Sequence, residues 1–339
     1  MSDEAEDQTL SDVVVLQRGT TYKSALLGQP GPVLLGLASM QRDGGFRGDS
    51  LKTYGGPSAD KLLLHPGDIY ISLKDVTQSG DLLGAVARVP ASVPEGRLTQ
   101  DTVKLEVVEE SVPSDYLYWL LRTPQYRAYC RSHAIGTTNL SLSRQDFLDF
   151  PVTTPSSRQL SLTETLQALD DKIEVNRRIS ETLEEIARAL FKSWFVDFDP
   201  VRGTATVPEG IRRLFPDRLV DSQIGPIPEG WAVAKVGDVA TVNARTAKDA
   251  DLPETIRYAD ISSAGKDGSV TPLELSRASA PSRARRRVTH GDTVLSTVRP
   301  ERGAHFLCLN PPSHLIASTA FATLTPSRVP WSYLYTSER

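Results

Sequence analysis

Few side chains in this sequence have the types and spacing that catalysis or metal binding requires. The histidines show no metal-ligand spacing; they are His65, His133, His290, His305 and His314. The two cysteines, Cys130 and Cys308, lie far apart and form no CxxC pair, so we expect ordinary buried thiols in a reducing compartment. No phosphate-binding P-loop is present. The acidic pair Asp170 and Asp171 precedes Lys172 as in some nucleases, but it falls in a charged helical segment without a convincing upstream acid.

One short motif points to methyl transfer and fails on inspection. Residues 310–313 read Asn-Pro-Pro-Ser, whereas adenine methyltransferases carry an aromatic residue in the fourth place to stack on the flipped base. Ser313 cannot stack, and no glycine-rich loop for a methyl-donor cofactor lies upstream. The sequence therefore predicts a turn here, no catalytic site and no metal.

Charge is distributed unevenly along a chain whose formal net charge is −4. The first twelve residues hold five acidic side chains and no basic one, so we expect neither a signal nor a transit peptide. Residues 277–302 hold seven arginines against Asp292 and Glu301. A basic patch on a nearly neutral body is typical of nucleic-acid binding, although a solvated surface loop would look the same.

The side chains best suited to reading bases are arginine, lysine, asparagine and glutamine, because each can offer two hydrogen-bonding groups to one base edge. The candidates before the middle of the chain are Gln41, Arg42, Arg47, Lys52, Lys74, Thr138 and Asn139, the last two in a Gly-Thr-Thr-Asn turn suited to phosphates. The later candidates are Arg283, Arg285, Arg286, Arg287, Arg299 and Arg302.

A single long helix is predicted over residues 156–196, which contain neither Gly nor Pro. Ser156 and Gln159 have capping-box spacing at its start. Apolar residues spaced three and four apart give the seam of a coiled coil, with polar interruptions at two places: Leu162, Leu166, Leu169, Ile173, Asn176, Ser180, Leu183 and Leu190. The helix ends in aromatic residues that suit subunit docking, or packing on the loop that follows: Phe191, Trp194 and Phe195.

The regions on either side of this helix match each other. His-Pro-Gly-Asp-Ile-Tyr-Ile-Ser from His65 recurs as Thr-His-Gly-Asp-Thr-Val-Leu-Ser from Thr289, and Tyr-Leu-Tyr recurs at Tyr116 and Tyr333. A third match, around Leu10 and Val236, keeps the same order, which indicates a duplication. We expect the Gly-Asp pairs to form tight turns that lead into strands, and the loops at residues 41–58 and 262–287 to differ completely.

The sequence from the Gly-Thr-Thr-Asn turn through Phe-Lys-Ser-Trp-Phe-Val-Asp-Phe-Asp-Pro-Val-Arg, at residues 191–202, to the second Gly-Asp turn resembles the specificity subunit of type I restriction-modification systems. The resemblance implies a non-catalytic, cytoplasmic DNA-binding subunit for host defence. It would read a bipartite site in double-stranded DNA and dock methyltransferase (modification) subunits and a restriction (translocase-nuclease) subunit. S-adenosylmethionine, ATP and Mg would be bound by those partners and not by this chain. The alternatives are a coiled-coil scaffold without DNA readout and a stand-alone nuclease or methyltransferase.

The resulting architecture is α+β, with two similar mixed α/β target-recognition domains joined by a long coiled-coil-type helix. The predicted limits are residues 1–150 for the first domain, 151–200 for the spacer helix, 201–225 for a linker and 226–339 for the second domain. Compared with the family pattern, we expect the second domain to be C-terminally incomplete and to lack a second conserved helix. We therefore expect a homodimer paired through the long helix as one outcome.

Overall fold

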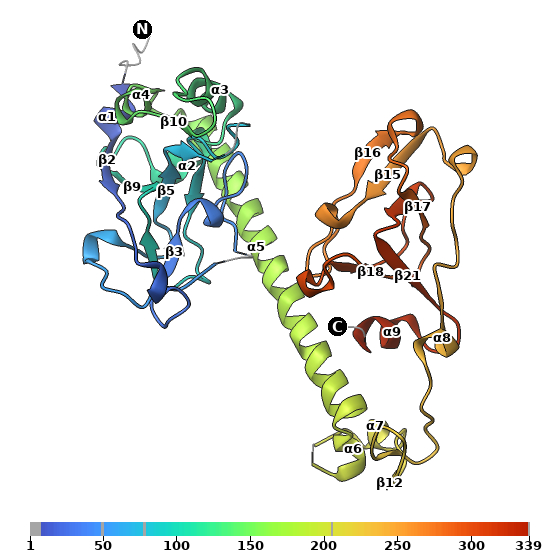
Figure 1. Cartoon of the computed structure of the whole chain (residues 1–339). Coiled ribbons are helices and arrows are strands. Elements are labelled where there is room, and N and C mark those ends of the chain that lie inside the picture. Colours follow the sequence, from blue (N-terminus) through green and yellow to red (C-terminus); the bar gives the residue numbers. More distant parts are fainter. Residues whose placement is uncertain (1–7, 49–50, 77–78, 205, 338–339) are drawn as a thin grey trace. The chain divides into compact units, whose positions relative to one another are not determined.

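The computed structural model describes residues 8–48, 51–76, 79–204 and 206–337 (Figure 1). Four of the five acidic residues near the N-terminus, and the last residues of the predicted second domain, lie outside these ranges. The chain divides into two compact units, Met1–Asn176 and Arg177–Arg339, so the division falls within the long helix. The predicted domain limits, which treat that helix as a separate element, stay predictions.

The first unit contains a four-stranded antiparallel sheet in the order β2-β9-β5-β7 and a three-stranded sheet in the order β3-β8-β4. In the second sheet β3 runs parallel to β8, and β4 runs antiparallel to it. The strands are β2 (Val14–Arg18), β9 (Thr102–Val107), β5 (Ile69–Ser72), β7 (Val86–Arg88), β3 (Val33–Leu35), β8 (Gly96–Leu98) and β4 (Leu63–Leu64). The first unit also contains two short strand pairs: β1 (Gln8–Thr9) with β11 (Pro151–Val152), and β6 (Lys74–Asp75) with β10 (Leu140–Ser141). The helices are α1 (Leu10–Val13), α2 (Ser114–Leu120), α3 (Pro124–Ser132), α4 (Arg144–Leu148) and the start of α5.

The second unit repeats this plan. Its antiparallel sheet has the order β14-β21-β18-β19, and its mixed sheet has the order β16-β15-β20-β17, again with one parallel pair, β15 and β20. The strands are β14 (Ala240–Val242), β21 (Phe321–Pro326), β18 (Thr293–Ser296), β19 (His305–Leu307), β16 (Leu273–Ser276), β15 (Thr255–Ala259), β20 (Leu315–Ser318) and β17 (Ala284–Arg287). Strands β12 (Leu219–Val220) and β13 (Ile227–Pro228) pair, and the helices are α6 (Asp199–Arg202), α7 (Glu209–Arg212), α8 (Val236–Val239) and α9 (Trp331–Ser337). The predicted duplication is confirmed, and so is the α+β class with one long helix between two similar parts.

The predicted Gly-Asp turns are built from identical hydrogen bonds. In the first unit the carboxylate of Asp68 accepts from the amide of His65 at 2.8 Å, and Gly67 has φ +94°. In the second, Asp292 accepts from the amide of Thr289 at 2.8 Å, and Gly291 has φ +85°. Glycine adopts such a φ without steric cost, which explains why the pair recurs. Each turn leads directly into the central strand, β5 or β18.

The two turn aspartates differ in what else they bind. Asp68 accepts a hydrogen bond from Lys104 at 3.0 Å and is partly exposed. Asp292 is fully buried and accepts from Arg245 at 3.0 Å and from the hydroxyl of Thr325 at 2.7 Å. A buried carboxylate needs such partners because it has lost its water. Asp292 therefore anchors its sheet more strongly than Asp68 does.

The long helix α5 is Ser157–Phe191, and a π-helical turn, Lys192–Val196, extends it. The predicted capping box is present: the amide of Ser156 donates to Oε1 of Gln159 at 2.9 Å, and the amide of Gln159 donates to Oγ of Ser156 at 3.4 Å. At ~1.5 Å per residue the α-helical part is about 52 Å long. The chain then turns sharply at Phe198, whose φ is +57°.

We expect replacement of Asp292 by alanine to lower the free energy of unfolding by about 2 kcal/mol, because Arg245 and Thr325, both half-buried, lose the buried carboxylate that accepts their hydrogen bonds. The matched change, Asp68→Ala, should cost about 1 kcal/mol, since Asp68 is partly solvated. Urea denaturation followed by tryptophan fluorescence measures both changes. Equal losses, or a larger loss for Asp68→Ala, would contradict this account of the turns.

Candidate nucleic-acid interface

Residues 41–47 form a tight turn, which we call the first turn. Its base is closed by a bridge between Met40 and Phe46, by the amide of Gln41 donating to the carbonyl of Gly45 at 2.9 Å, and by the amide of Arg47 donating to the carbonyl of Ser39 at 2.9 Å. Three consecutive residues, Asp43, Gly44 and Gly45, have positive φ values of 60°, 107° and 110°. Asp and Gly tolerate this conformation best, so the sequence Arg-Asp-Gly-Gly dictates the turn.

The first turn is attached to the start of β7 and to the connection between β5 and β7. The amide of Gly45 donates to the carbonyl of Val86 at 2.8 Å, and the amide of Asp43 donates to the carbonyl of Asp81 at 2.9 Å. The turn therefore extends the end of the four-stranded sheet and projects Arg42 beside that connection.

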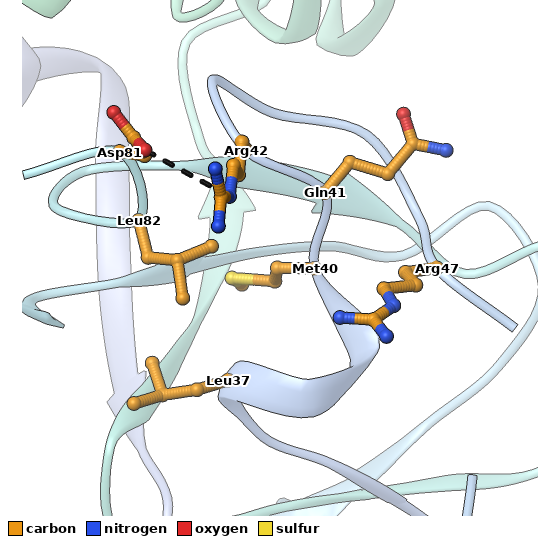
Figure 2. A pocket seen from close by; sticks show the side chains of 7 residues that line it. All are labelled: Leu37, Met40, Gln41, Arg42, Arg47, Asp81 and Leu82. Atoms are coloured by element: carbon orange, nitrogen blue, oxygen red, sulfur yellow. Dashed lines mark ion pairs between the residues drawn. The ribbon is translucent and has the colours of Figure 1, made fainter. Parts of the chain in front are cut away.

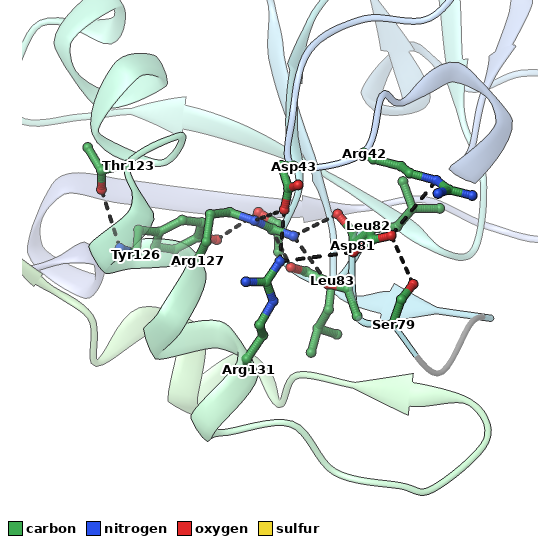
Figure 3. Close-up of polar contacts among 12 residues, drawn as sticks. Arg42, Asp43, Ser79, Asp81, Leu82, Leu83, Thr123, Tyr126, Arg127 and Arg131 are labelled. Carbon is green, nitrogen blue, oxygen red and sulfur yellow. Dashed lines mark hydrogen bonds and ion pairs between the residues drawn. The ribbon is translucent and has the colours of Figure 1, made fainter. Parts of the chain in front are cut away.

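Two arginines of α3 hold these segments together (Figure 3). Arg127 is only 4% exposed, and its guanidinium donates to the carbonyls of Leu83, of Gly80 at 3.2 Å and of Asp81 at 2.7 Å. It also donates to the carboxylate of Asp43 at 3.4 Å, and Arg131 reaches the same carboxylate at 3.0 Å. The buried guanidinium of Arg127 thus holds both the first turn and the β5–β7 connection in place, and it does not face solvent.

A shallow pocket of about 370 Å³ lies at the first turn. Leu37, Met40 and Leu82 supply its apolar part, and Gln41, Arg42, Arg47 and Asp81 supply its polar part. Figure 2 shows the guanidinium of Arg42 turned toward the carboxylate of Asp81; Nε lies 3.8 Å from Oδ2, and the arginine side chain is 82% exposed. Three predicted DNA-binding residues, Gln41, Arg42 and Arg47, thus line one site.

The second unit carries an equivalent turn at residues 265–271, which we call the second turn. Ala264 and Val270 form the bridge, the amide of Gly265 donates to the carbonyl of Ser269 at 2.9 Å, and the amide of Thr271 donates to the carbonyl of Ser263 at 2.8 Å. These three interactions match those at the base of the first turn one for one.

This match corrects the prediction that the two loop regions differ completely. Lys266, Asp267 and Gly268 occupy the places of Arg42, Asp43 and Gly44, and the sequence-based predictions did not include them. The signal was available in the constant spacing, because Asp43 and Asp267 are separated by the same 224 positions as Gly67 and Gly291.

The aspartates of the two turns are held differently. Partial burial raises the pKa of Asp267, but hydrogen bonds from the hydroxyl and the amide of Ser269, at 2.6 and 3.1 Å, outweigh it and leave that pKa below its usual value. Asp267 is therefore supported from within its own turn, whereas Asp43 is supported by α3.

A pocket of about 440 Å³ lies beside the second turn. It is lined by Asp260, Ile261, Ser262, Ala264, Arg283, Arg302, Ala304, Ser318 and Ala320. Both pockets lie between the same two kinds of segment. One is a short 3-10 turn after a strand of the mixed sheet, Leu37–Ser39 after β3 or Ile261–Ser263 after β15. The other is the connection that leads into β7 or β19. Two predicted residues, Arg283 and Arg302, lie in the second pocket with exposed side chains.

The rest of the arginine cluster belongs to strand β17, which pairs with β20. Arg285 and Arg286 are half-buried, and Arg286 donates to the hydroxyl of Thr246 at 3.4 Å. Arg287 is exposed and donates to the carbonyl of Asp251. Much of this cluster therefore stabilises the mixed sheet, while Arg283 stands at its edge. Arg299 is exposed in a left-handed conformation, with φ +54°.

The remaining predicted residues of the first unit lie outside its pocket lining. Lys74 is in β6 and forms an ion pair with Asp101 at 3.1 Å. Lys52 is exposed, and its carbonyl accepts from the amide of Leu34 at 2.8 Å. Thr138 and Asn139 are exposed in the loop before β10, which Gly136 starts with φ +110°. None of these interactions tests the predicted roles, which stay predictions.

The aromatic residues at the end of α5 pack against the rest of the second unit. The ring of Phe195 lies 5.9 Å from that of Trp231, 6.1 Å from that of Phe215 and 5.3 Å from that of Tyr333. Phe191 also packs on Tyr333, at 5.4 Å, and Trp194 on Phe215, at 6.2 Å. All three helix residues are half-buried. These contacts correspond to the predicted alternative in which the aromatic residues pack within the chain. The part of their surface that stays exposed is compatible with the predicted subunit docking, which stays a prediction.

The apolar stripe of α5 is largely exposed within the described chain. Its exposed members lie between 43% and 67% of full exposure: Leu162, Leu169, Ile173, Leu183 and Leu190. Leu166 is half-buried, and Asn176 and Ser180 are exposed. The pairing of this seam with another helix stays a prediction.

The described residues contain no cluster of His, Cys, Asp and Glu that could hold a metal ion. Both cysteines are buried; burial, with a smaller contribution from the Asp292 carboxylate, raises the pKa of the Cys308 thiol to about 12, and burial raises that of Cys130. The Asn-Pro-Pro-Ser segment lies in the connection between β19 and β20, with Asn310 at φ +47°, so it is the predicted turn. Among the described helices, none combines the length and apolarity of a membrane span.

The sequence relatives of this chain include two named specificity subunits. The MjaIX type I restriction enzyme specificity subunit of Methanocaldococcus jannaschii is 30% identical over 159 residues, which are 47% of this chain and 33% of that protein. The HindI type I restriction enzyme specificity subunit of Haemophilus influenzae is 62% identical over 47 residues, 14% of this chain and 10% of that protein. This chain is a homologue of type I specificity subunits. The resemblance predicted from the sequence is confirmed.

The matched stretches span a third or less of each relative's own length. Among solved structures, the S subunit of a type I restriction-modification system from M. genitalium has the same fold as this type I homologue, with a TM-score of 0.52 at 12% identity, over 99% of this chain and 77% of that one. No family model matches the chain.

We expect Arg127→Leu to destabilise the first unit by about 3 kcal/mol, because three buried carbonyls lose their donor. Arg131→Leu removes the same charge from the same helix and from the same partner, Asp43. It should cost less than about 1 kcal/mol, since that arginine is half exposed. Urea denaturation monitored by circular dichroism compares the two variants. A similar loss for both would show that the buried arginine does not hold the segments together.

Proposed function

We propose that this chain is the non-catalytic DNA-specificity subunit of a type I restriction-modification complex. The observation that carries the proposal is the repetition of one site in both units: a tight turn with an exposed basic residue, next to a shallow pocket lined by arginine. Two copies of a reading surface on one chain suit a bipartite site, because each copy can bind one half. The names of the two sequence relatives support the same function.

The surfaces suit DNA on chemical grounds. Exposed arginines supply both the phosphate attraction that dominates affinity and the paired donors that recognise base edges. Small-molecule sites usually enclose most of the ligand, so shallow open pockets are better suited to contact with a large surface such as duplex DNA. Helix α5 would act as the spacer between the two readers, and its length would fix the gap between half-sites.

The chemistry of cleavage and methylation would belong to other subunits. Restriction and modification partners would bring S-adenosylmethionine, ATP and Mg, and the complex would work in the cytoplasm. The half-buried aromatic cluster around Phe195, together with the exposed Val196 beside it, is the surface we assign to the modification subunit. A second copy of the chain is the other proposed partner of the α5 stripe.

Simultaneous replacement of Arg283 and Arg302 by alanine tests the proposal. Both side chains are exposed at the second pocket, so the fold should be retained. We expect weaker binding to double-stranded DNA and a salt dependence that is shallower by about one unit of log-log slope for each phosphate that is no longer neutralised. Binding is measured by fluorescence anisotropy at several salt concentrations.

Arg328→Ala is the matched control. Arg328 is exposed and follows Pro326, which pairs with Ala240 at the end of the sheet opposite to Ser296 and Phe321. Its loss should leave affinity and slope unchanged. If wild-type protein shows no DNA binding, or if the control weakens binding as much as the double variant does, the proposal fails; the scaffold without DNA readout would then be favoured.

A further inference from the structure

The strongest unassigned feature is the residue at the tip of the second turn. Lys266 is exposed, and it follows Gly265 and precedes Asp267 as Arg42 follows Gln41 and precedes Asp43. Both side chains belong to turns closed by the same three backbone interactions. The bases of the two turns are thereby placed alike, while the tips differ in backbone: Asp43, Gly44 and Gly45 all have positive φ, whereas Gly268 alone does in the second turn.

Each tip also meets the same neighbouring connection in its own unit. Arg42 lies 3.8 Å from Asp81, in the connection between β5 and β7. Lys266 borders Gly303, in the connection between β18 and β19: a Cβ on that glycine would lie 3.7 Å from the Cβ of Lys266. The tip and the connection form one surface in both copies, and in both copies it borders the pocket.

We propose that Arg42 and Lys266 are equivalent base-reading residues, one for each half of a bipartite DNA site. This inference rests on the proposed function and names residues that carry its sequence specificity. Arginine presents a planar pair of donors that matches the two acceptors of guanine in the major groove, and the carboxylate of Asp81 lies 3.8 Å from Nε of Arg42. Lysine offers a single flexible ammonium group. One backbone frame would thus read the two halves with different stringency.

The two turns also differ in the side chains that flank their tips. Gln41 and Arg47 line the first pocket, whereas Gly265 and Thr271 stand at the matching places in the second unit. The first turn therefore carries two arginines, whereas the second carries one lysine. In the second unit Arg283 and Arg302 come from other segments and supply charge beside the turn.

The test is selection of binding sites from a random double-stranded DNA library by the full chain. Variants Arg42→Ala and Lys266→Ala change exposed side chains, so folding is preserved. Each should lower discrimination at one base pair, by about 10- to 100-fold for Arg42→Ala and less for Lys266→Ala, in different halves of the selected site. Lys266→Arg should sharpen the preference for guanine at the position that Lys266→Ala relaxes.

The controls remove a positive charge elsewhere in each unit. Arg158→Ala, on the first turn of α5, matches Arg42→Ala, and Arg328→Ala matches Lys266→Ala; both should select the wild-type site. If the two tip variants keep wild-type preferences, or lower affinity equally for all sequences, the tips do not read bases and this inference is wrong while the proposed function stands. If the wild-type chain selects no sequence, the proposed function fails and the inference fails with it.

Discussion

The carboxylate of a turn aspartate, accepting from a backbone amide three residues earlier, is the interaction on which each half of this molecule is built. Asp68 and Asp292 make it at the same 2.8 Å. Each closes a turn that only glycine can enter without strain and starts the central strand of an antiparallel sheet. That strand lies between β9 and β7 in the first unit and between β21 and β19 in the second, and the connection leads from it to the edge strand. The surface proposed to read DNA in each unit lies beside that connection.

In each unit this connection contacts the Asp-Gly turn, the first turn at residues 41–47 or the second turn at residues 265–271. In the first unit, a buried arginine from α3 ties the turn to the connection. In the second unit, Ser269 supports the turn from within. The closed base of the turn is therefore shared by the two units, while the interactions that support the turn differ. This arrangement separates the frame, which is shared, from the exposed side chains, which can change without loss of the frame.

Much of the frame could be predicted from the sequence because it depends on local rules. Gly67 and Gly291 mark turns, Ser156 and Gln159 mark the start of α5, and the absence of Gly and Pro predicts the helix itself. The second turn was missed because Arg-Asp-Gly-Gly and Lys-Asp-Gly-Ser share only the Asp-Gly pair, which is common in turns. The arginine cluster at residues 283–287 looked uniform, yet pairing of β17 with β20 divides it into half-buried and exposed side chains. That pairing joins residues about thirty positions apart, and no local pattern reveals it.

The central claim, that one reading turn occurs in both units and faces DNA, is tested most directly by photo-crosslinking. A photoreactive residue placed at position 42, 266 or 328 of the full chain is irradiated on a DNA duplex that carries the selected site. The account predicts crosslinks to DNA from positions 42 and 266, in different halves of the site, and none from position 328. Absence of crosslinks from both turns, or equal crosslinking from position 328, would contradict it.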